Sequence, residues 1–561
     1  MMAKANTGYS IVNTEDSGKI NTTDIIFLVG IVIAVQGYFV RNLGFYSDDW
    51  WILSTLASAK THSIFEILHS AFGSKAFIVR PVQGLELSVL YWLFGTNPLG
   101  YHIVNALTLA SGIALFYLTL SQLKVQRTIA VGVPLIYALL PHYSTTRFWI
   151  ASFTANISIV FFLLNLYAGL RCLSVKNGSV QKRRWLLVSL FSVLASVMAY
   201  EVVLPLFFVN FSVFLFKLKK QKALYIAKHK FNIHALLISN ILLLIGGIAY
   251  KFILSERTGG FNGQYINHVV RVIRYSVTND YWTYGVKIPI VLWKIIKSYY
   301  SSRLFFTATA LFLTVFIYLI RIEAFFYEHF DWLKLILVGV VFYFGGYAAF
   351  LITTNFQVSA AGISNRITIA AAIGVAVCFV GGGGFLCSFI NVERIRNVVF
   401  SFLLAGFGFC GYIINCTISH FYIDSYVQEL AVLKSIYLDI PNISNNNTII
   451  LDGVCPYVGP VPVFDCSWDL SGALALHYKK TIKADVRTRR LSYNLKGIVT
   501  YVYGMKSFYP YNKDLFVYNF KDKKTYFLND FEKANTYFSL ISPQLSECSN
   551  ALEGEGIRIF K

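Results

Sequence analysis

Long apolar stretches alternate with polar connections along most of this chain of 561 residues. About eleven of the stretches are apolar enough to be predicted as membrane-spanning helices, for which roughly 20 residues are typical. They cover residues 25–40, 101–123, 128–140, 149–170, 185–199, 202–216, 234–254, 304–320, 335–353, 367–390 and 398–420. The pattern predicts a polytopic α-helical membrane domain over residues 25–420.

The first polar connection, residues 41–100, is long enough to be an external loop with structure of its own. Within it, residues 62–72 and 81–94 are predicted to form short helices, the second with Pro81 in its first turn, where helices tolerate proline. Segment 81–94 is short for a span and contains Glu86. It is therefore predicted to lie in the membrane interface rather than to cross the bilayer.

The distribution of basic residues supports this arrangement. If residues 81–94 do not cross, every basic loop falls on the side of the N-terminus; the loops contain Lys124, Arg127, Arg171, Lys182, Arg183, Arg184, Lys217, Lys219, Lys220, Lys222, Arg394 and Arg396. Because Lys and Arg collect in cytoplasmic loops, residues 1–24 are predicted to be cytoplasmic. The loop 41–100 and the C-terminal region are then extracytoplasmic.

Composition agrees with a membrane protein. Only 14% of the residues are charged and 56% are hydrophobic, whereas soluble domains carry about 25% charged residues. The net charge of +21 comes from 49 Lys and Arg against 28 Asp and Glu, and the cytoplasmic loops account for much of it. Nucleic acid is therefore not an expected partner, whereas membrane lipids are.

The last part of the chain, residues 421–561, has turn clusters between β-rich pieces. The predicted strands include residues 448–451, 498–503 and 515–519, and residues 469–478 are predicted to be helical. These patterns indicate a small extracytoplasmic α+β domain, which needs a surface to cover its aromatic residues.

Most of the eight cysteines lie in or beside predicted spans, where a small packing role is expected. Cys455 and Cys466 instead flank a short loop of the external domain. An oxidising compartment favours a disulfide between them, and two free thiols are the alternative. No spacing of Cys and His suggests a structural metal.

Charged and polar side chains gather where the apolar segments meet the first loop. Asp48 and Asp49 follow the first span, Arg80 precedes Pro81, and His102 and Asn105 lie three apart near the start of the second span. A carboxylate here could act as general base, and an arginine fork suits a phosphate. This layout is expected for chemistry on an anionic substrate carried in the membrane.

Structural roles are the alternatives for the same residues. The two aspartates could be solvated loop acids, Arg80 could reach lipid headgroups, and His102 and Asn105 could hydrogen-bond between helices. Glu201, at the outer end of a span, is a functional candidate by its position or the partner of an external arginine. Asp48 and Asp49 could also hold a divalent ion, but no third ligand accompanies them, so no cofactor is expected to be required.

Three sequence blocks resemble the GT-C glycosyltransferases, in order and in spacing. They are Asp48-Asp49-Trp50, Arg80-Pro81-Val82-Gln83, and the run YWLFGTNPLGYHIVN at residues 91–105. The similarity is greatest to the protein O-mannosyltransferase-like branch that includes the transmembrane TPR mannosyltransferases. Blocks at residues 141–152, 200–205 and 365–368 also fit, so that the resemblance covers roughly residues 25–400.

The resemblance implies a GT-C type fold and a sugar donor linked to polyprenyl or dolichyl phosphate. By family position Asp48 is the general base, with Asp49 orienting it, binding substrate or exchanging roles with it. Candidates for binding the donor phosphate are Arg80, His102, Arg147 and Arg366. Candidates for binding other parts of the substrates are Asn105, His142, Tyr200 and Glu201.

The sequence therefore predicts an inverting glycosyltransferase of a bacterial inner membrane, with its site on the extracytoplasmic side. The expected acceptor is a lipid-linked glycan or a surface polysaccharide such as O-antigen. Family members often carry an acid where this chain has Thr145-Thr146 and a lysine where it has Tyr200, and no TPR array follows. A protein is the alternative acceptor. A flippase or other transporter and a polymerase of lipid-linked glycans are the alternative functions.

Overall fold

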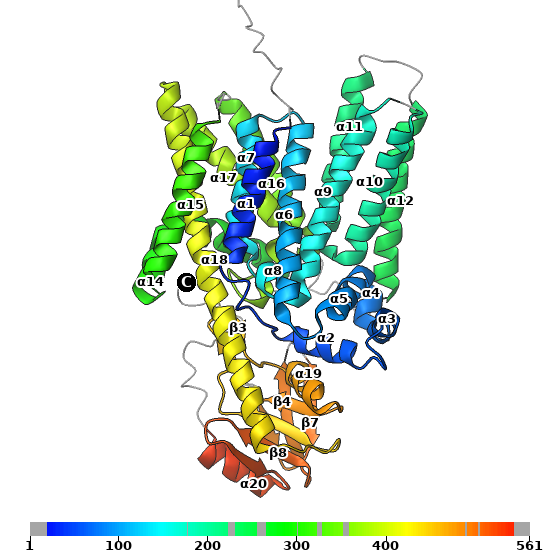
Figure 1. Cartoon of the computed structure of the whole chain (residues 1–561), viewed down its shortest axis with the longest axis vertical. Helices are drawn as coiled ribbons and strands as arrows, with labels where there is room; N and C mark the ends of the chain where they lie inside the picture. Colours follow the sequence, from blue (N-terminus) through cyan, green and yellow to red (C-terminus); the bar gives the residue numbers. More distant parts are fainter. Residues whose placement is uncertain are drawn as a thin grey trace, which may run out of the picture.

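The protein is an elongated bundle of helices with a small domain at one end (Figure 1). It is described here by a computed structural model that covers residues 20–542, apart from residues 177, 223–229, 255–264, 300, 323–327, 352–357, 488–490 and 503–504.

Every predicted span falls on a helix of the bundle. These helices are α1 (Thr22–Gly37), α6 (Pro98–Gln122), α7 (Arg127–Leu139), α9 (Phe153–Ser174), α10 (Val180–Ala199), α11 (Phe207–Lys222), α12 (Lys230–Leu254), α15 (Ser302–Ile320), α16 (His329–Leu351), α17 (Ala371–Ser388) and α18 (Glu393–Asp439). Among the described residues, seven helical stretches, in α6, α9, α12, α15, α16, α17 and α18, are long and apolar enough to cross a bilayer, and α1 and α7 are apolar but shorter. The chain is thus a multi-pass membrane protein, and the count of eleven spans stays a prediction.

Short helices occupy the end of the bundle that faces the small domain. The predicted helices at residues 62–72 and 81–94 are confirmed as α3 (Ile64–Phe72) and α5 (Pro81–Phe94), whereas α2 and α4 were not predicted. The remaining short elements are α2 (Asp48–Ala57), α4 (Lys75–Val79), η1 (Pro141–Tyr143), α8 (Thr145–Phe148), η2 (Ile150–Ser152), η3 (Glu201–Leu206), α13 (Tyr265–Val277), η4 (Thr278–Val286), α14 (Ile288–Tyr299) and η5 (Ile363–Thr368).

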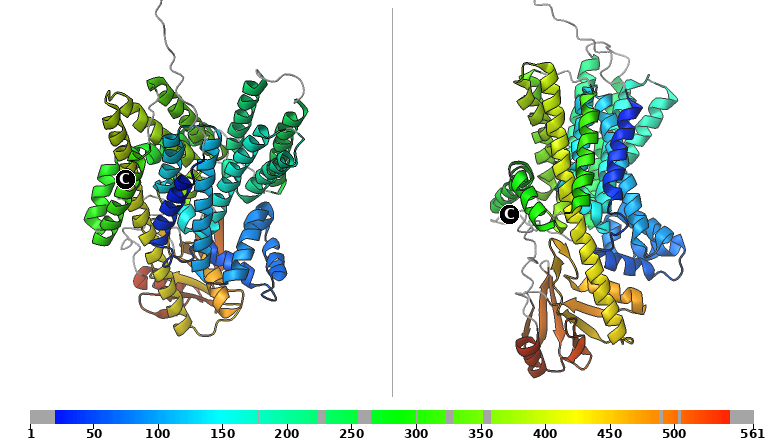
Figure 2. Two further views of the ribbon diagram at one scale, coloured as in Figure 1. Left: turned by 45° about the horizontal axis from the view of Figure 1, so that its top comes forward. Right: turned by 60° about the vertical axis from the view of Figure 1, so that its left-hand side comes forward.

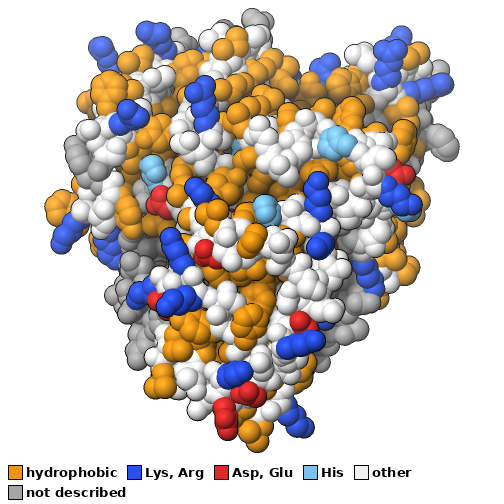
Figure 3. Space-filling view, turned by 60° about the horizontal axis from the view of Figure 1, so that its bottom comes forward, with side chains coloured by type: hydrophobic (Ala, Val, Ile, Leu, Met, Phe, Trp, Pro, Cys, Tyr) orange, Lys and Arg blue, Asp and Glu red, His pale blue; other side chains and the backbone are white. Residues whose placement is uncertain are grey.

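Surface chemistry changes between the bundle and the domain. Viewed from the domain end, hydrophobic side chains are most continuous over the upper part of the face, while the tapered lower part carries basic and acidic groups mixed together (Figure 3). This difference is expected where a lipid-facing bundle meets an aqueous domain.

One helix joins the two parts without a break. Helix α18 has 47 residues, which corresponds to about 70 Å at 1.5 Å per residue, whereas a hydrocarbon core is about 30 Å thick. The helix crosses the bundle and continues into the small domain (Figure 2). The predicted domain boundary at residue 420 therefore lies inside α18, and the domain's first strand begins only at Thr448.

The C-terminal domain is the predicted α+β unit. Its main sheet has the order β4-β1-β8-β9, in which β1 pairs in parallel with β4 and β8, and β8 pairs antiparallel with β9. Helix α19 connects β1 to β4. The elements are β1 (Thr448–Asp452), β2 (Tyr457–Val458), β3 (Val461–Pro462), α19 (Ser467–Tyr478), β4 (Lys483–Val486), β5 (Ser492–Asn494), β6 (Gly497–Val502), β7 (Met505–Pro510), β8 (Leu515–Asn519), β9 (Lys524–Phe527), α20 (Phe531–Thr536) and η6 (Tyr537–Ile541).

The domain and the first external loop share one hydrophobic core. Ile449 and Leu474 of the domain belong to the same buried cluster as Leu53 of α2, Ile67 of α3 and Leu90 of α5. Apolar burial is the main favourable term in folding. The external loop and the C-terminal domain are therefore expected to fold as one structural unit.

The predicted bridge between Cys455 and Cys466 is wrong. Cys455 is disulfide-bonded, but Cys466 is a free, buried thiol. The Cys466 side chain lies at the N-terminus of α19 and takes part in its capping box with Asp469, and this local role orients the sulfur. Proximity in sequence was a poor guide because strands β2 and β3 lie between the predicted partners and α19 begins directly after Cys466.

Alkylation of the unfolded, non-reduced protein should label Cys466 and leave Cys455 unlabelled, because Cys466 carries a free thiol and Cys455 is disulfide-bonded. Peptide mass spectrometry reads both sites separately. After reduction both cysteines should be labelled. Equal labelling of the two sites before reduction would contradict this assignment.

Candidate functional site

The site is organised around the first turn of α2. Ser47, which precedes this helix, has φ of +48° and is buried, a conformation that a residue with a Cβ seldom adopts. The backbone is held there by hydrogen bonds to the main chain of Tyr46: Trp149 Nε1 donates to its carbonyl at 2.9 Å. Strain of this kind is found where the surrounding structure fixes it, often at functional sites, and here it directly precedes Asp48 and Asp49.

Asp49 accepts hydrogen bonds from two backbone N–H groups. Its Oδ2 accepts the N–H of Tyr46 at 2.9 Å and its Oδ1 accepts the N–H of Ala151 at 2.7 Å. The side chain is 1% exposed, and burial raises the pKa of Asp49 well above its usual value, although these amides oppose the shift. Asp49 therefore ties α2 to η2, and both of its oxygens are occupied.

Asp48 has one carboxylate oxygen that no described residue bonds. It is half-buried, and Trp468 Nε1 of α19 donates to its Oδ1 at 2.7 Å, while no described residue bonds its Oδ2. Burial raises the pKa of Asp48 above the ordinary 3.8, and the charges of Arg366 and Arg80 partly oppose this rise. Asp48 thus has one fixed oxygen and one oxygen open to a substrate.

Arg366 belongs to η5 and lies close enough to Asp48 for its charge to lower the pKa of that carboxyl. Its Nη1 donates to the carbonyl of Ile363 at 3.1 Å, and its guanidinium lies 5.0 Å from the ring centroid of Trp149. The neighbouring Asn365 fixes η5 by donating to the His142 carbonyl at 2.7 Å. Within the described part of the chain Arg366 has no acidic partner, so its charge is available to an anion.

Arg80, unlike Arg366, is paired with an acidic side chain. Its guanidinium makes a two-pronged contact with Glu201, and Lys251 Nζ donates to the same carboxylate at 2.9 Å. The Arg80 guanidinium also stacks 4.4 Å above the ring of Tyr200. Burial would raise the pKa of Glu201, but Arg80 and Lys251 hold it well below its usual value. The three charged groups carry a net charge of one positive unit.

His102 and Asn105 are buried among backbone groups. His102 Nε2 contacts the carbonyl of Gly44 at 3.0 Å. Asn105 Nδ2 donates to the carbonyl of Thr146 at 3.1 Å, and its amide oxygen accepts from Asn156 at 2.8 Å. These contacts give both residues a structural role, and their predicted role in substrate binding stays a prediction.

His142 and Arg147 are also buried, at 1% and 3% exposure. His142 Nε2 contacts the carbonyl of Asp280 at 3.0 Å, and burial lowers the pKa of His142 to about 4. Arg147 Nη2 donates to the carbonyls of Ala138 and Leu140 at the end of α7. Their predicted contacts with phosphate or acceptor are untested. Of the predicted set, Arg366 and Arg80 lie close enough to Asp48 to influence its ionisation, and Tyr200 and Glu201 contact Arg80.

Three participants were not predicted. Trp468 lies 420 positions from Asp48, and no local pattern links them. Glu429 of α18 is buried and accepts from Trp50 Nε1 at 3.0 Å. Lys251 did carry a signal, because a lysine inside an apolar span is a functional or ion-pair candidate by default.

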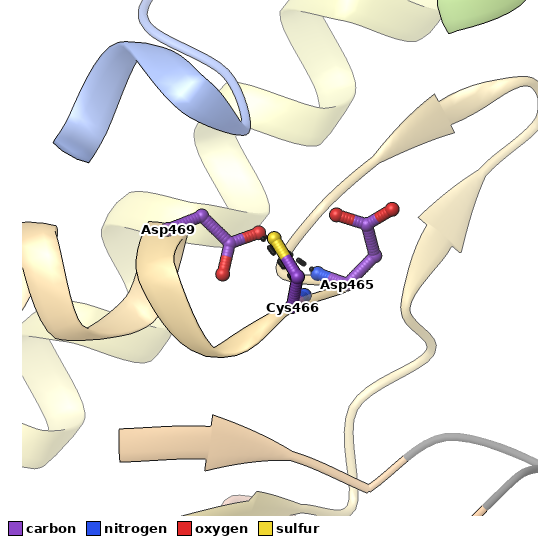
Figure 4. A group of neighbouring side chains, drawn as sticks. All are labelled: Asp465, Cys466 and Asp469. Atoms are coloured by element: carbon purple, nitrogen blue, oxygen red, sulfur yellow. Dashed lines mark hydrogen bonds between the residues drawn. The ribbon is translucent and has the colours of Figure 1, made fainter. Parts of the chain in front are cut away.

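One group of the domain has side chains of metal-binding type. Ligand atoms of Asp465, Cys466 and Asp469 lie within 4.8 Å of one another (Figure 4). The Asp469 carboxylate, however, accepts backbone N–H groups of Asp465 at 3.0 Å, Cys466 at 3.4 Å and Leu470 at 2.6 Å. The group is accounted for as the N-terminal cap of α19.

Comparison with known proteins finds similarity among solved structures alone. No family model and no curated protein matches the chain. Among solved structures the chain is similar to ArnT from Cupriavidus metallidurans bound to undecaprenyl phosphate, with 12% identity and a TM-score of 0.36. The match covers 83% of this chain and 86% of that chain. Identity and TM-score are both low, so we assign the function from the residues of this chain.

The two aspartates should respond oppositely to replacement by asparagine. Asp49→Asn should lower the free energy of unfolding by about 1–3 kcal/mol. In the wild type each carboxylate oxygen accepts one backbone N–H, whereas in the variant the amide NH₂ would face one of these N–H groups and leave it without an acceptor. Asp48→Asn should keep or raise stability at pH 7. Thermal unfolding of the purified protein at two pH values measures both effects.

The expected direction of the stability change in Asp48→Asn follows from the raised pKa of Asp48. Below the unfolded-state pKa the protonated Asp48 stabilises the native state, and this contribution is lost as pH rises through the native pKa. Any increase in the free energy of unfolding caused by Asp48→Asn should therefore be present at pH 7 and vanish below about pH 4. A loss of stability at pH 7 in Asp48→Asn alone would contradict the assignment of the two roles.

Proposed function

We propose that this chain is an integral-membrane glycosyltransferase of the GT-C type. It transfers a sugar from a polyprenyl-phosphate-linked donor to an acceptor on the extracytoplasmic side. The observation that carries the proposal is the state of Asp48: an ionisable, half-buried carboxylate with one oxygen held by Trp468 and the other open, beside arginines that form no ion pair with it. Proton removal and phosphate recognition can thus occur side by side.

The proposed reaction is a direct displacement. The acceptor hydroxyl attacks the anomeric carbon of the donor while Asp48 Oδ2 takes the hydroxyl proton. The bond between that carbon and the phosphate oxygen breaks, and the electron pair leaves with polyprenyl phosphate. Attack opposite the leaving group inverts the anomeric configuration. General-base catalysis of this kind contributes typically 10²–10⁴-fold.

Arg366 is the proposed primary phosphate ligand. Its guanidinium is unpaired among the described residues and lies close enough to Asp48 to influence its ionisation, whereas Arg80 is already bound to Glu201. The fork of an arginine matches two phosphate oxygens. Arg80, Glu201 and Lys251 are proposed to supply a weaker positive field from the membrane side.

The proposed reaction needs no metal ion. Each Asp49 oxygen already accepts a backbone N–H group, which supports the proposal that Asp48 and Asp49 do not share a cation. A pair of oxygens from one remaining carboxylate is a poor site for Mg²⁺ or Ca²⁺. The charge of the leaving phosphate is assigned to the arginines instead.

Sidedness is proposed from charge. Helix α6 begins beside α2 and runs to the opposite end of the bundle (Figure 1), where Lys124 and Arg127 follow it. Basic loops of a bacterial inner-membrane protein face the cytoplasm, so that the site and the C-terminal domain face the extracytoplasmic space. The proposed acceptor there is a lipid-linked glycan or surface polysaccharide such as O-antigen, with a protein as the variant.

Asp48→Asn should lower sugar transfer at least about 10²-fold, because the acceptor loses its base. Transfer from radiolabelled polyprenyl-phosphate sugars to lipid-linked glycans, to protein and to water is measured in proteoliposomes. Glu66→Gln, in the same external loop, is the matched control and should keep wild-type activity. Full activity of Asp48→Asn would remove the proposed base, and glycan movement across the bilayer without transfer would favour a transporter.

Arg366→Ala should lower kcat/KM for the donor by about 10–100-fold, the size of one lost hydrogen bond to a charged group. Arg366→Lys should recover part of that loss because it keeps the charge. Arg80→Ala should act mainly on stability, since it breaks the contact with Glu201. Donor titrations and thermal unfolding of the three variants separate the effects; a larger loss of donor affinity in Arg80→Ala than in Arg366→Ala would reverse the two roles.

A further inference from the structure

Helix α19 of the C-terminal domain packs directly onto the backbone of α2. A Cβ at Gly472 would lie 2.6 Å from the carbonyl carbon and oxygen of Trp50 and 2.7 Å from the backbone nitrogen of Trp51. Since the obstructing atoms are backbone, they could not move aside cheaply. Glycine at this position is therefore what allows the two helices to approach so closely.

Trp468 lies one turn before Gly472 on the same helix. Residues four apart share a face of an α-helix, so Trp468 is carried towards α2 by the same contact. It reaches the first turn of α2, where its indole N–H donates to Asp48 Oδ1 at 2.7 Å. The closest approach of the two helices and the hydrogen bond to the proposed base are thus parts of one interface.

The placement of α19 is fixed from a second direction. Glu429 of α18 accepts from Trp50 Nε1 at 3.0 Å, and the hydroxyl of Tyr437 donates to the carbonyl of Ala473 at 3.3 Å. Helix α18 therefore contacts both α2 and α19. Helix α19, which carries Trp468, is therefore packed against both α2 and α18.

We propose that the C-terminal domain completes the catalytic site, with Trp468 as the positioning residue that fixes Asp48 so that only its Oδ2 faces the acceptor. The inference rests on the proposed function, and it assigns to the domain a part in the reaction itself. The acceptor then approaches Asp48 in a space bounded by α19.

The hydrogen bond should also tune the proton affinity of Asp48. A donor aimed at a carboxylate favours its ionised form, so loss of the indole N–H should raise the pKa of Asp48. Transfer needs the ionised base, and its rate therefore rises with pH through that pKa. A residue that only holds the domain together would alter stability without moving this transition.

The decisive variant is Trp468→Phe in the full-length protein, which keeps an aromatic ring and removes the N–H. The pH midpoint at which dicyclohexylcarbodiimide labels Asp48 should shift upward by on the order of one unit, as read by peptide mass spectrometry. The acid limb of the transfer rate should shift equally. Trp51→Phe, whose indole N–H bonds no described residue, should leave both transitions in place.

A second pair of variants tests the interface. Gly472→Ala should reproduce the shift because it pushes α19 away from α2, whereas Gly406→Ala, where a Cβ meets nothing within 4 Å, should not. Trp468→His, which keeps a ring N–H, should restore part of the wild-type midpoint. Identical labelling midpoints in wild type, Trp468→Phe and Gly472→Ala would overturn the inference.

The two readouts separate the inference from the function on which it rests. Carbodiimide labelling does not require turnover, so a shifted midpoint supports the coupling of Trp468 to Asp48 whatever the activity is. A wild-type protein that transfers no sugar from any donor would overturn the proposed function, and with it the catalytic role of Trp468. Transfer with unshifted transitions would overturn the role of Trp468 alone.

Discussion

The single unbroken helix α18 is the constraint on which the site depends. It belongs to the membrane bundle at one end and to the C-terminal domain at the other, and Glu429 and Tyr437 contact α2 and α19 on the way. Because there is no flexible linker at this junction, the domain cannot take many positions relative to the first external loop. Residues that are distant in sequence can therefore meet at Asp48 with fixed geometry.

The site contains two acids and two arginines, and in each pair one side chain is already bonded within the protein while the other is available to a substrate. Asp49 is committed to backbone amides, whereas Asp48 keeps an open oxygen; Arg80 is committed to Glu201, whereas Arg366 has no described acidic partner. In each pair one residue builds the scaffold and the other faces the reaction. Burial of a carboxylate costs free energy, and the Trp468 hydrogen bond together with the nearby arginines offsets part of that cost at Asp48.

Much of the fold was predictable because it is governed by local signals. Apolar length located the helices of the bundle, Pro81 marked the start of α5, and residues 515–519 coincide with β8. Asp48 and Arg366 were singled out from their sequence blocks, and their roles in the reaction stay predictions. Glu201 does pair with an external arginine, Arg80, which was the structural alternative for it. Trp468, Glu429 and the second partner of Glu201, Lys251, were not predicted, since these contacts join elements far apart in sequence. The error at Cys455 and Cys466 arose the same way: capping of α19 decided where that sulfur points.

The continuity of α18 has a consequence for how this protein can vary. Each residue added to an α-helix advances the following structure by about 1.5 Å and turns it by roughly 100°. Between the bundle and the domain, where residues 421–439 of α18 lie, a single insertion or deletion would turn α19 away from α2. Exposed positions in this segment, such as Val427 and Leu438, can be substituted, but the number of residues in the segment is constrained. Among proteins that share this architecture, we expect variation in the loops of the domain and constant length in this part of the helix.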